Sequence, residues 1–225
     1  MSAANVTDTD FIYVFPSEIA SDASGAVALN WSDAGGAFGQ RRPLALSPGA
    51  ATVQGIPAAL TAEECAQVVA MGEALPRNSG RVELGPDAYR VSHIAWIEPQ
   101  PANHWLFHKL AVLFAQANRH FGFEISGFVE ALQYTRYGAG QHFDWHLDLG
   151  PDQTSARKLS MSLQLSAPAE YDGGLLEFSS LSPGEEARQL GTGVFFPSYL
   201  AHRVSPVTRG VRRSLVAWAY GPAFR

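Results

Sequence analysis

The sequence contains a single cysteine, Cys65, among its 225 residues. One cysteine cannot form an intrachain disulfide, and it cannot supply the thiolates of a cysteine-based structural zinc site. Its place on the apolar side of a predicted helix is typical of a core residue and not of a nucleophile. The sequence therefore excludes disulfide-stapled scaffolds and cysteine-based zinc modules.

The chain also lacks a block of basic charge and a long apolar run. Lys and Arg number 16 against 21 Asp and Glu, which gives a net charge of −5. An acidic chain with scattered basic residues is not expected to bind nucleic acid or an anionic membrane. No apolar stretch approaches the length of a membrane span, and the polar start MSAANVTDTD does not resemble a signal peptide. We therefore expect a soluble, cytoplasmic protein.

Two parts of the chain differ in composition. Residues 1–57 are rich in Gly, Ala and Ser and show no sustained period, apart from the apolar run FIYVF at 11–15. We expect them to form an N-terminal extension that wraps the core or acts as a lid. Residues 58–225 carry regular patterns, and we expect them to form one folded domain.

The folded part begins with helices and continues with short strands. Thr61 and Glu64 form the Thr-x-x-Glu pattern of a capping box, which predicts a helix over 61–75. Leucines at helical spacing predict a second helix over 103–120. Strands are predicted at 90–97, 128–137, 141–148, 158–166, 174–179, 192–204 and 211–220. This order predicts an α+β fold, mainly β, with a sandwich or barrel in its second half.

The pattern His-x-Asp occurs twice within residues 137–148, as His142 with Asp144 and as His146 with Asp148. On a strand, residues two apart face the same way, so all four side chains would share one face. Burying such a face is costly without partners, but an isolated His-x-Asp is commonly solvated surface. The pattern alone does not identify a metal site.

The end of the chain strengthens the case for a metal. His202 lies late on one predicted strand, and Arg212 and Ser214 lie early on the next, across a predicted turn at 205–210. Two histidines and one carboxylate on a β scaffold can hold Fe(II) as a facial triad with open positions. A nearby arginine offers a planar fork for a carboxylate. Together these residues predict a site for iron and a dicarboxylate co-substrate.

This ordered set of motifs resembles the Fe(II)/2-oxoglutarate-dependent oxygenases, and more narrowly their prolyl-4-hydroxylase-like branch with the PKHD-type hydroxylases. The resemblance extends over roughly residues 58–220. It rests on YGAG at 137–140, HLD at 146–148, YDGGLLEF at 171–178, and His202 followed ten residues later by Arg212. It implies a distorted double-stranded β-helix, a jelly-roll-like core, with the helices packed outside the larger sheet.

The resemblance implies that His146, Asp148 and His202 bind the iron, which assigns the second His-x-Asp pair to the metal. His142 and Asp144 fall at positions that vary in the family, so they would surround the site, face the substrate or lie at the surface. A carboxylate in the triad leaves no position for a halide, which disfavours a halogenase.

The resemblance also implies a co-substrate pocket. Arg212 would hold the distal carboxylate of 2-oxoglutarate with help from Ser214, and Tyr137 would line the pocket. The strand 158–166 often contributes a tyrosine to this carboxylate in the family. Here KLSMSLQLS offers only serines and Gln164, which is a departure from the pattern.

The implied activity is hydroxylation of an unactivated C–H bond with Fe(II), 2-oxoglutarate and O2, supported by ascorbate. The substrate would be a prolyl residue of a peptide or protein, a free amino acid or another small molecule. Two alternatives stay open. One is a cupin-type iron dioxygenase in which Arg212 has no co-substrate role, and the other is a non-catalytic β-sandwich binding module.

Several other residues receive structural interpretations. Trp145 and Trp218, at strand positions, are expected in the core. The pair Gly173 and Gly174 is expected to satisfy a turn. His104 and His108 lack the intervening glutamate of metalloproteases, so we expect surface or packing roles.

Overall fold

The computed structural model describes residues 18–21, 27–30, 49, 52–76, 78–79 and 89–223. The chain divides into two compact units, Met1–Ser47 and Pro48–Arg225. In the first unit, β1 (Glu18–Ser21) pairs antiparallel with β2 (Val27–Asn30). The apolar run at 11–15 lies outside the described residues, and the lid or wrapping role of residues 1–57 stays a prediction.

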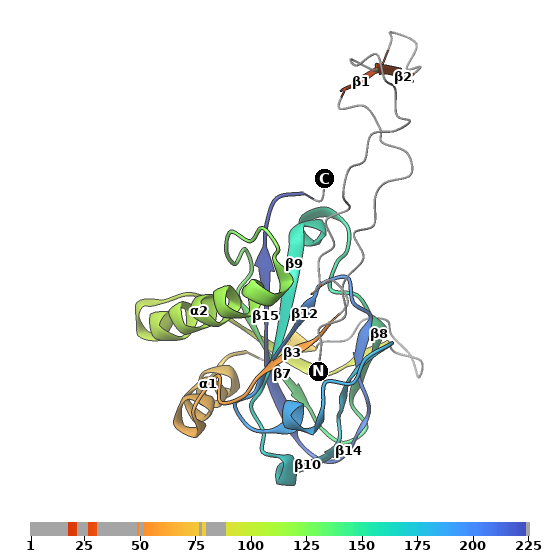
Figure 1. The fold of residues 1–225 in the computed structure, drawn as a ribbon. Coiled ribbons are helices and arrows are strands. Elements are labelled where there is room, and N and C mark those ends of the chain that lie inside the picture. Colours follow the sequence, from red (N-terminus) through yellow and green to blue (C-terminus); the bar gives the residue numbers. More distant parts are fainter. Residues whose placement is uncertain are drawn as a thin grey trace, which may run out of the picture. The chain divides into compact units, whose positions relative to one another are not determined.

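A seven-stranded antiparallel sheet forms the larger layer of the second unit (Figure 1). Its strands, in spatial order, are β3 (Gln54–Ile56), β12 (Gly193–Pro197), β9 (Arg157–Gln164), β15 (Arg212–Tyr220), β7 (Leu132–Tyr137), β6 (His93–Ile97) and β4 (Asn78–Ser79). The longest strand, β15, lies between β9 and β7, so it supplies side chains to the middle of the sheet.

The two faces of this sheet differ because apolar and polar residues alternate along its strands. In β9, Leu159, Met161 and Leu163 are fully buried in the core shared with the helices. Between and after them, Ser162 and Gln164 point the other way and line cavities. One segment of sequence thus builds the core with one face and a polar floor with the other.

Two helices cover the apolar face of the larger sheet, α1 (Ala62–Ala74) and α2 (His104–Phe121) (Figure 1). The predicted capping box is present: the Glu64 amide donates to the Thr61 hydroxyl, and the Thr61 amide donates to the Glu64 carboxylate. The buried stripe of α2 consists of Leu106, Leu110, Leu113, Phe114, Ala117 and Phe121. Both helices confirm the predicted ranges to within one residue.

A smaller four-stranded sheet lies on the side of the larger sheet away from the helices (Figure 1). In spatial order it contains β11 (Leu176–Phe178), β13 (His202–Val204), β8 (His142–His146) and β5 (Arg90–Val91). A separate pair is formed by β10 (Tyr171–Gly173) and β14 (Val207–Gly210). Short 3-10 helices span Pro101–Asn103, Asp152–Ala156, Pro168–Glu170 and Glu185–Arg188. Two sheets with outer helices confirm the predicted α+β, mainly β fold, a double-stranded β-helix.

Two predictions about the C-terminal strands are wrong. The stretch 192–204 is not one strand but two, β12 in the larger sheet and β13 in the smaller one. The predicted turn at 205–210 contains β14. The chain breaks at these points because it passes from one sheet to the other, and a continuous strand cannot belong to both layers. Within the described ranges, no helix combines the length and the apolar character needed to cross a membrane.

Candidate metal and co-substrate site

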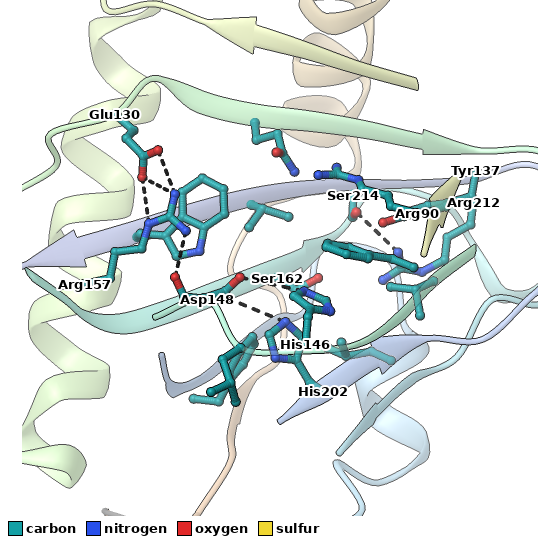
Figure 2. A pocket seen from close by; sticks show the side chains of 18 of the residues that line it. Arg90, Glu130, Tyr137, His146, Asp148, Arg157, Ser162, His202, Arg212 and Ser214 are labelled. Atoms are coloured by element: carbon teal, nitrogen blue, oxygen red, sulfur yellow. Dashed lines mark hydrogen bonds and ion pairs between the residues drawn. The ribbon is translucent and has the colours of Figure 1, made fainter. Parts of the chain in front are cut away.

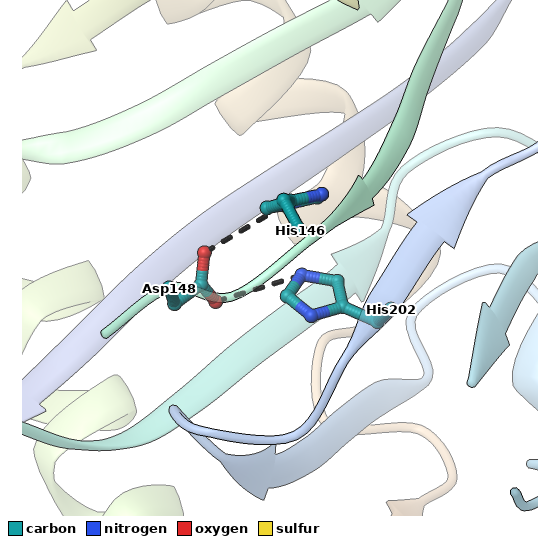
Figure 3. Close-up of side chains that lie close together, drawn as sticks. All are labelled: His146, Asp148 and His202. Carbon is teal, nitrogen blue, oxygen red and sulfur yellow. Dashed lines mark ion pairs between the residues drawn. The ribbon is translucent and has the colours of Figure 1, made fainter. Parts of the chain in front are cut away.

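Three potential metal ligands converge at the inner face of the smaller sheet (Figure 3). His146 ends β8, His202 opens β13, and the two residues are paired across the strands. Asp148 follows β8, and its two carboxylate oxygens lie 3.8 Å from Nε2 of His146 and 3.6 Å from Nε2 of His202. One candidate ligand atom from each residue lies within 4.8 Å of the others, close enough for a single ion to contact all three.

Backbone carbonyls orient both imidazole rings. Nδ1 of His146 lies 2.7 Å from the carbonyl oxygen of Asp144, and Nδ1 of His202 lies 2.9 Å from that of Leu200. A carbonyl oxygen can only accept, so each Nδ1 carries the proton and donates. The lone pair of a neutral imidazole is then on Nε2, the atom that faces Asp148, which suits metal binding.

Electrostatics at the cluster favours a bound cation. Burial opposes ionisation of Asp148, but the neighbouring His202 and His146 lower its pKa overall. Burial, together with the neighbouring His202, lowers the pKa of His146 to about 4, so its ring is neutral near pH 7. Oδ2 of Asp148 is buried and accepts no hydrogen bond from the described residues. Burying an ionised carboxylate without hydrogen bonds to both oxygens costs free energy unless a cation compensates the charge.

A β-bulge precedes His146 and changes which side chains face the site. His202 pairs with His146, while Val204, two residues further on, pairs with Phe143, three residues back. The extra residue breaks the strict alternation of the strand. Phe143 and His146 therefore face the same cavity, with their rings stacked at a centroid distance of 3.5 Å.

Two residues near the bulge are more exposed than the sequence predicted. Trp145 is 40% exposed instead of lying in the core, and Leu147 is 50% exposed. Asp144 is exposed and His142 is half-buried, and neither belongs to the cluster of potential ligands. Trp218 is buried as predicted, although one side of it lines the cavity.

A cavity of about 330 Å³ opens beside the three ligands (Figure 2). The polar face of the larger sheet lines it, and Tyr137, Arg212 and Ser214 stand at one end. Arg212 is 3% exposed, and its Nη1 donates to the hydroxyl of Ser214 at 3.3 Å. Its Cζ lies 5.7 Å from the ring centre of Tyr137. No acidic side chain of the described residues pairs with this guanidinium, so this end of the cavity favours an anionic ligand.

Two arginines that line the cavity were not predicted from the sequence. Arg90 of β5 is 8% exposed, its Nε donates to Ser92, and its Cζ lies 4.6 Å above the ring of Phe143. Its Nη2 is buried and donates to none of the described residues. At the other end, Arg157 lies between Glu130 and the backbone of Asp148 (Figure 2). No local pattern marks either residue, because strand pairing and packing between distant segments bring them to the site.

The donor set fits Fe(II) with a 2-oxo acid. Two imidazole nitrogens and one carboxylate oxygen form the facial arrangement of non-haem iron sites. Oδ2 of Asp148, which accepts no hydrogen bond from the described residues, supplies the charge for a cation. Arg212, which faces no carboxylate of those residues, supplies a counterpart for a ligand carboxylate in the same cavity. The four residues that the sequence assigned to one site, His146, Asp148, His202 and Arg212, line one cavity in the structure.

Known proteins are similar to this chain in sequence. A family model described as the 2OG-Fe(II) oxygenase superfamily matches residues 132–220, the segment that contains the three potential ligands and Arg212. A PKHD-type hydroxylase of Thioalkalivibrio sulfidiphilus is 31% identical over 166 residues, which cover 70% of this chain and 73% of that protein. A PKHD-type hydroxylase of Synechococcus sp. is 34% identical over 116 residues, 48% of this chain and 51% of that protein. The chain therefore spans about half the length of the Synechococcus relatives.

Solved structures share the fold. A Pseudomonas putida prolyl-4-hydroxylase superposes with a TM-score of 0.60 at 22% identity, covering 76% of this chain and 93% of that one. A prolyl hydroxylase of Trichoplax adhaerens, in complex with a peptide fragment of the hypoxia inducible factor oxygen degradation domain, superposes with a TM-score of 0.61 at 19% identity, covering 77% and 84%. The fold, the matching segment and the extended similarity to the Thioalkalivibrio protein agree, and this chain belongs to the 2OG-Fe(II) oxygenase superfamily, in its PKHD-type branch.

Proposed function

We propose that this protein is an Fe(II)- and 2-oxoglutarate-dependent dioxygenase that hydroxylates an unactivated C–H bond. The observation that carries the proposal is the shared cavity, which joins the cluster of His146, Asp148 and His202 to the guanidinium of Arg212, a cation with no acidic partner among the described residues. The three ligands would hold the metal, and Arg212 would hold the distal carboxylate of the co-substrate. When bound, iron and 2-oxoglutarate supply the oxidising chemistry with O2.

The residues of the chain would orient the reactants and exclude water. The carbonyls of Asp144 and Leu200 keep Nε2 of both histidines free to bind, as described above. The hydroxyl of Ser214 accepts from Arg212 and keeps its own hydrogen to donate, which places a second donor at the carboxylate end. Burial raises the pKa of Tyr137, so its phenol stays neutral and lines the pocket as a hydrogen-bonding group. Phe143, stacked on the ring of His146, would form an apolar wall of the cavity beside the metal.

The substrate class that the relatives support best is a prolyl residue of a peptide. The Pseudomonas and Trichoplax structures are of prolyl hydroxylases, and the latter holds a peptide. A free amino acid or another small molecule is the alternative substrate. A cytoplasmic location and support by ascorbate belong to the same proposal.

The other two candidate functions have less support. A cupin-type dioxygenase that does not use 2-oxoglutarate would leave a 3% exposed arginine facing the cavity without an anion. A non-catalytic binding module does not require a metal site, whereas the Nε2 atoms of two imidazoles here face one buried carboxylate. Membership in the superfamily also counts against both.

Succinate release tests the proposal. Purified protein receives Fe(II), ascorbate, O2 and 2-oxoglutarate, with and without proline-containing peptides, and wild type is compared with His146→Ala and His142→Ala. We expect succinate from wild type and His142→Ala, and none from His146→Ala. If only His142→Ala loses activity, the metal ligands are His142 and Asp144, the first His-x-Asp pair, and not His146 and Asp148. If wild type releases no succinate and binds no 2-oxoglutarate in an anaerobic titration with Fe(II), the proposal fails.

A further inference from the structure

Gln164 lies on the strand whose sequence, KLSMSLQLS, offers only serines and this glutamine to the co-substrate pocket. It ends β9 and pairs in register with Ser214 of β15, the residue that contacts Arg212. Gln164 is 3% exposed, and its Nε2 contacts both the carbonyl of Ser166 at 3.1 Å and the hydroxyl of Tyr171 at 2.9 Å. Because a carbonyl can only accept, the contacting atom is the amide nitrogen, which donates to both partners. Gln164 therefore holds the hydroxyl of Tyr171.

The hydroxyl of Tyr171 still has a hydrogen to donate. It accepts from Gln164, and no acceptor for its own O–H is present among the described residues. Tyr171 is 1% exposed, so bulk water does not compensate this group in the folded protein. A buried donor without an acceptor is unfavourable, and an oxygen atom of a ligand would satisfy it.

Gly174 shows how closely Tyr171 approaches Arg212. A methyl group added at Gly174 would lie 3.0 Å from Cδ of Arg212 and 3.4 Å from Cδ2 of Tyr171. The two side chains therefore pack around the same point, which only a glycine leaves open. The φ of +58° at Gly174 is itself a conformation that favours glycine. This agrees with the expected turn role of the pair and adds a packing reason for it.

Arg212 stands between two hollows of the structure. It lines the cavity beside the metal ligands, and it also lines a groove of about 580 Å³ together with Gln164, Tyr171 and Gly174. The guanidinium of Arg212 thus contacts the hydroxyl of Ser214 and lines the same groove as Tyr171. The hydroxyl of Tyr171 is in turn bonded to Gln164, the residue paired with Ser214 across the two strands. No carboxylate of the described residues pairs with Arg212, while a ligand carboxylate has acceptor positions for several donors.

We infer that Tyr171, oriented by Gln164, binds the distal carboxylate of the co-substrate together with Arg212. The inference rests on the proposed function, and it adds a phenol from β10 to the donors that β15 supplies. The alternative is a purely structural role, since the ring of Tyr171 packs with Tyr137, Val204 and Val207. Tyr171→Phe keeps the ring and removes only the hydroxyl, so it separates the two roles.

The test is anaerobic calorimetric titration of the Fe(II)-loaded full-length protein with two ligands. 2-Oxoglutarate carries the distal carboxylate, and pyruvate is a 2-oxo acid without it. Tyr171→Phe should weaken binding of 2-oxoglutarate about tenfold, the usual effect of losing a hydrogen bond to a charged group. Its affinity for pyruvate should equal that of wild type. Tyr199→Phe is the matched control and should change neither affinity, because Tyr199 packs against Phe123 and lines neither the cavity nor the groove.

Two further variants separate the possible failures. Gln164→Leu leaves the phenol in place but removes the amide that orients it, and should weaken 2-oxoglutarate binding by a smaller factor, again without affecting pyruvate. If Tyr171→Phe binds 2-oxoglutarate as wild type does while Arg212→Ala has lost it, the inference fails and the proposed function stands. An equal loss of both ligands in Tyr171→Phe also overturns the inference. If Arg212→Ala retains full affinity for 2-oxoglutarate, the co-substrate role in the proposed function fails.

Discussion

Arg157 donates a hydrogen bond from Nη1 to the backbone carbonyl of Asp148 at 2.9 Å. Its Nε and Nη2 contact the carboxylate of Glu130, and its Cζ lies 3.9 Å from the ring centre of Trp218. The amide of Asp148 donates to the carbonyl of Ser198 at 3.0 Å. The backbone of this potential ligand is thus held on both sides, and the guanidinium is held in turn by an ion pair and a ring.

Arg157→Lys should therefore weaken Fe(II) binding by about tenfold, because a compact ammonium cannot reach Glu130 and the Asp148 carbonyl at once. Anaerobic Fe(II) titration checks the affinity, and thermal unfolding of the metal-free protein checks the fold. Arg209→Lys is the control, since Arg209 forms an exposed ion pair with Asp172 at 2.6 Å. Unchanged Fe(II) affinity in Arg157→Lys would show that the contact does not position Asp148.

Phe143 should support His146 through ring stacking. The two rings are 15° from parallel at 3.5 Å, and Arg90 lies on the Phe143 ring at 4.6 Å. Phe143→Leu keeps apolar volume but loses the stacked ring, so Fe(II) affinity should fall about three- to tenfold. Phe143→Tyr keeps the ring and should bind Fe(II) within about twofold of wild type. The same affinity in the leucine and tyrosine variants would contradict a stacking role.

Gly72 of α1 allows the helix to approach the sheet at Tyr134. A methyl group at Gly72 would lie 2.2 Å from Cγ of the Tyr134 ring, which is 3% exposed. Alanine would gain about 1 kcal/mol in helix propensity, but overpacking a core commonly costs about 1–3 kcal/mol. With a clash this close, we expect Gly72→Ala to lower the free energy of unfolding by about 1–2 kcal/mol in urea titrations. Gly55→Ala, where no atom lies within 4 Å, should change it little, and equal stability of the two variants would refute the argument.

The ion pair between Glu64 and Lys109 should make stability depend on pH. The hydrogen bond from Lys109 and that from the Thr61 amide lower the pKa of Glu64. Because this pKa is lower in the folded state, the carboxylate contributes to the free energy of unfolding above its ordinary pKa. This contribution is lost as the pH falls through the pKa of Glu64 in the folded protein. Glu64→Gln keeps an acceptor for Thr61 but not the ion pair, so it should cost about 0.5 kcal/mol near neutral pH.

The difference between wild type and Glu64→Gln should shrink in urea titrations as the pH falls from about 5 to about 3. It should also shrink at neutral pH in high salt, because both side chains are partly exposed and the pair is screened. A difference that stays constant over this pH range would show that the ion pair contributes nothing.

The sequence by itself determined the features that depend on local order. Thr61 and Glu64 marked the start of α1 because a capping box involves only residues three apart. The stripe of α2 followed from the helical period. The ordered motifs around His146, Asp148, His202 and Arg212 indicated one site, and the structure does bring these side chains to one cavity. Their roles as ligands stay predictions for the experiments above.

Only the tertiary structure decided what depends on pairing between distant segments. The sequence placed Trp145 in the core, but it is 40% exposed and does not line the site cavity. A bulge against β13 turns Phe143, and not Trp145, toward the site. Arg90 reaches the cavity because β5 pairs with β8, and Tyr171 reaches Gln164 because β10 pairs with β14 and not with its nearest neighbours in sequence. Local patterns cannot encode these positions, since a bulge or a change of sheet is set by the partner strand and by the packing of both layers.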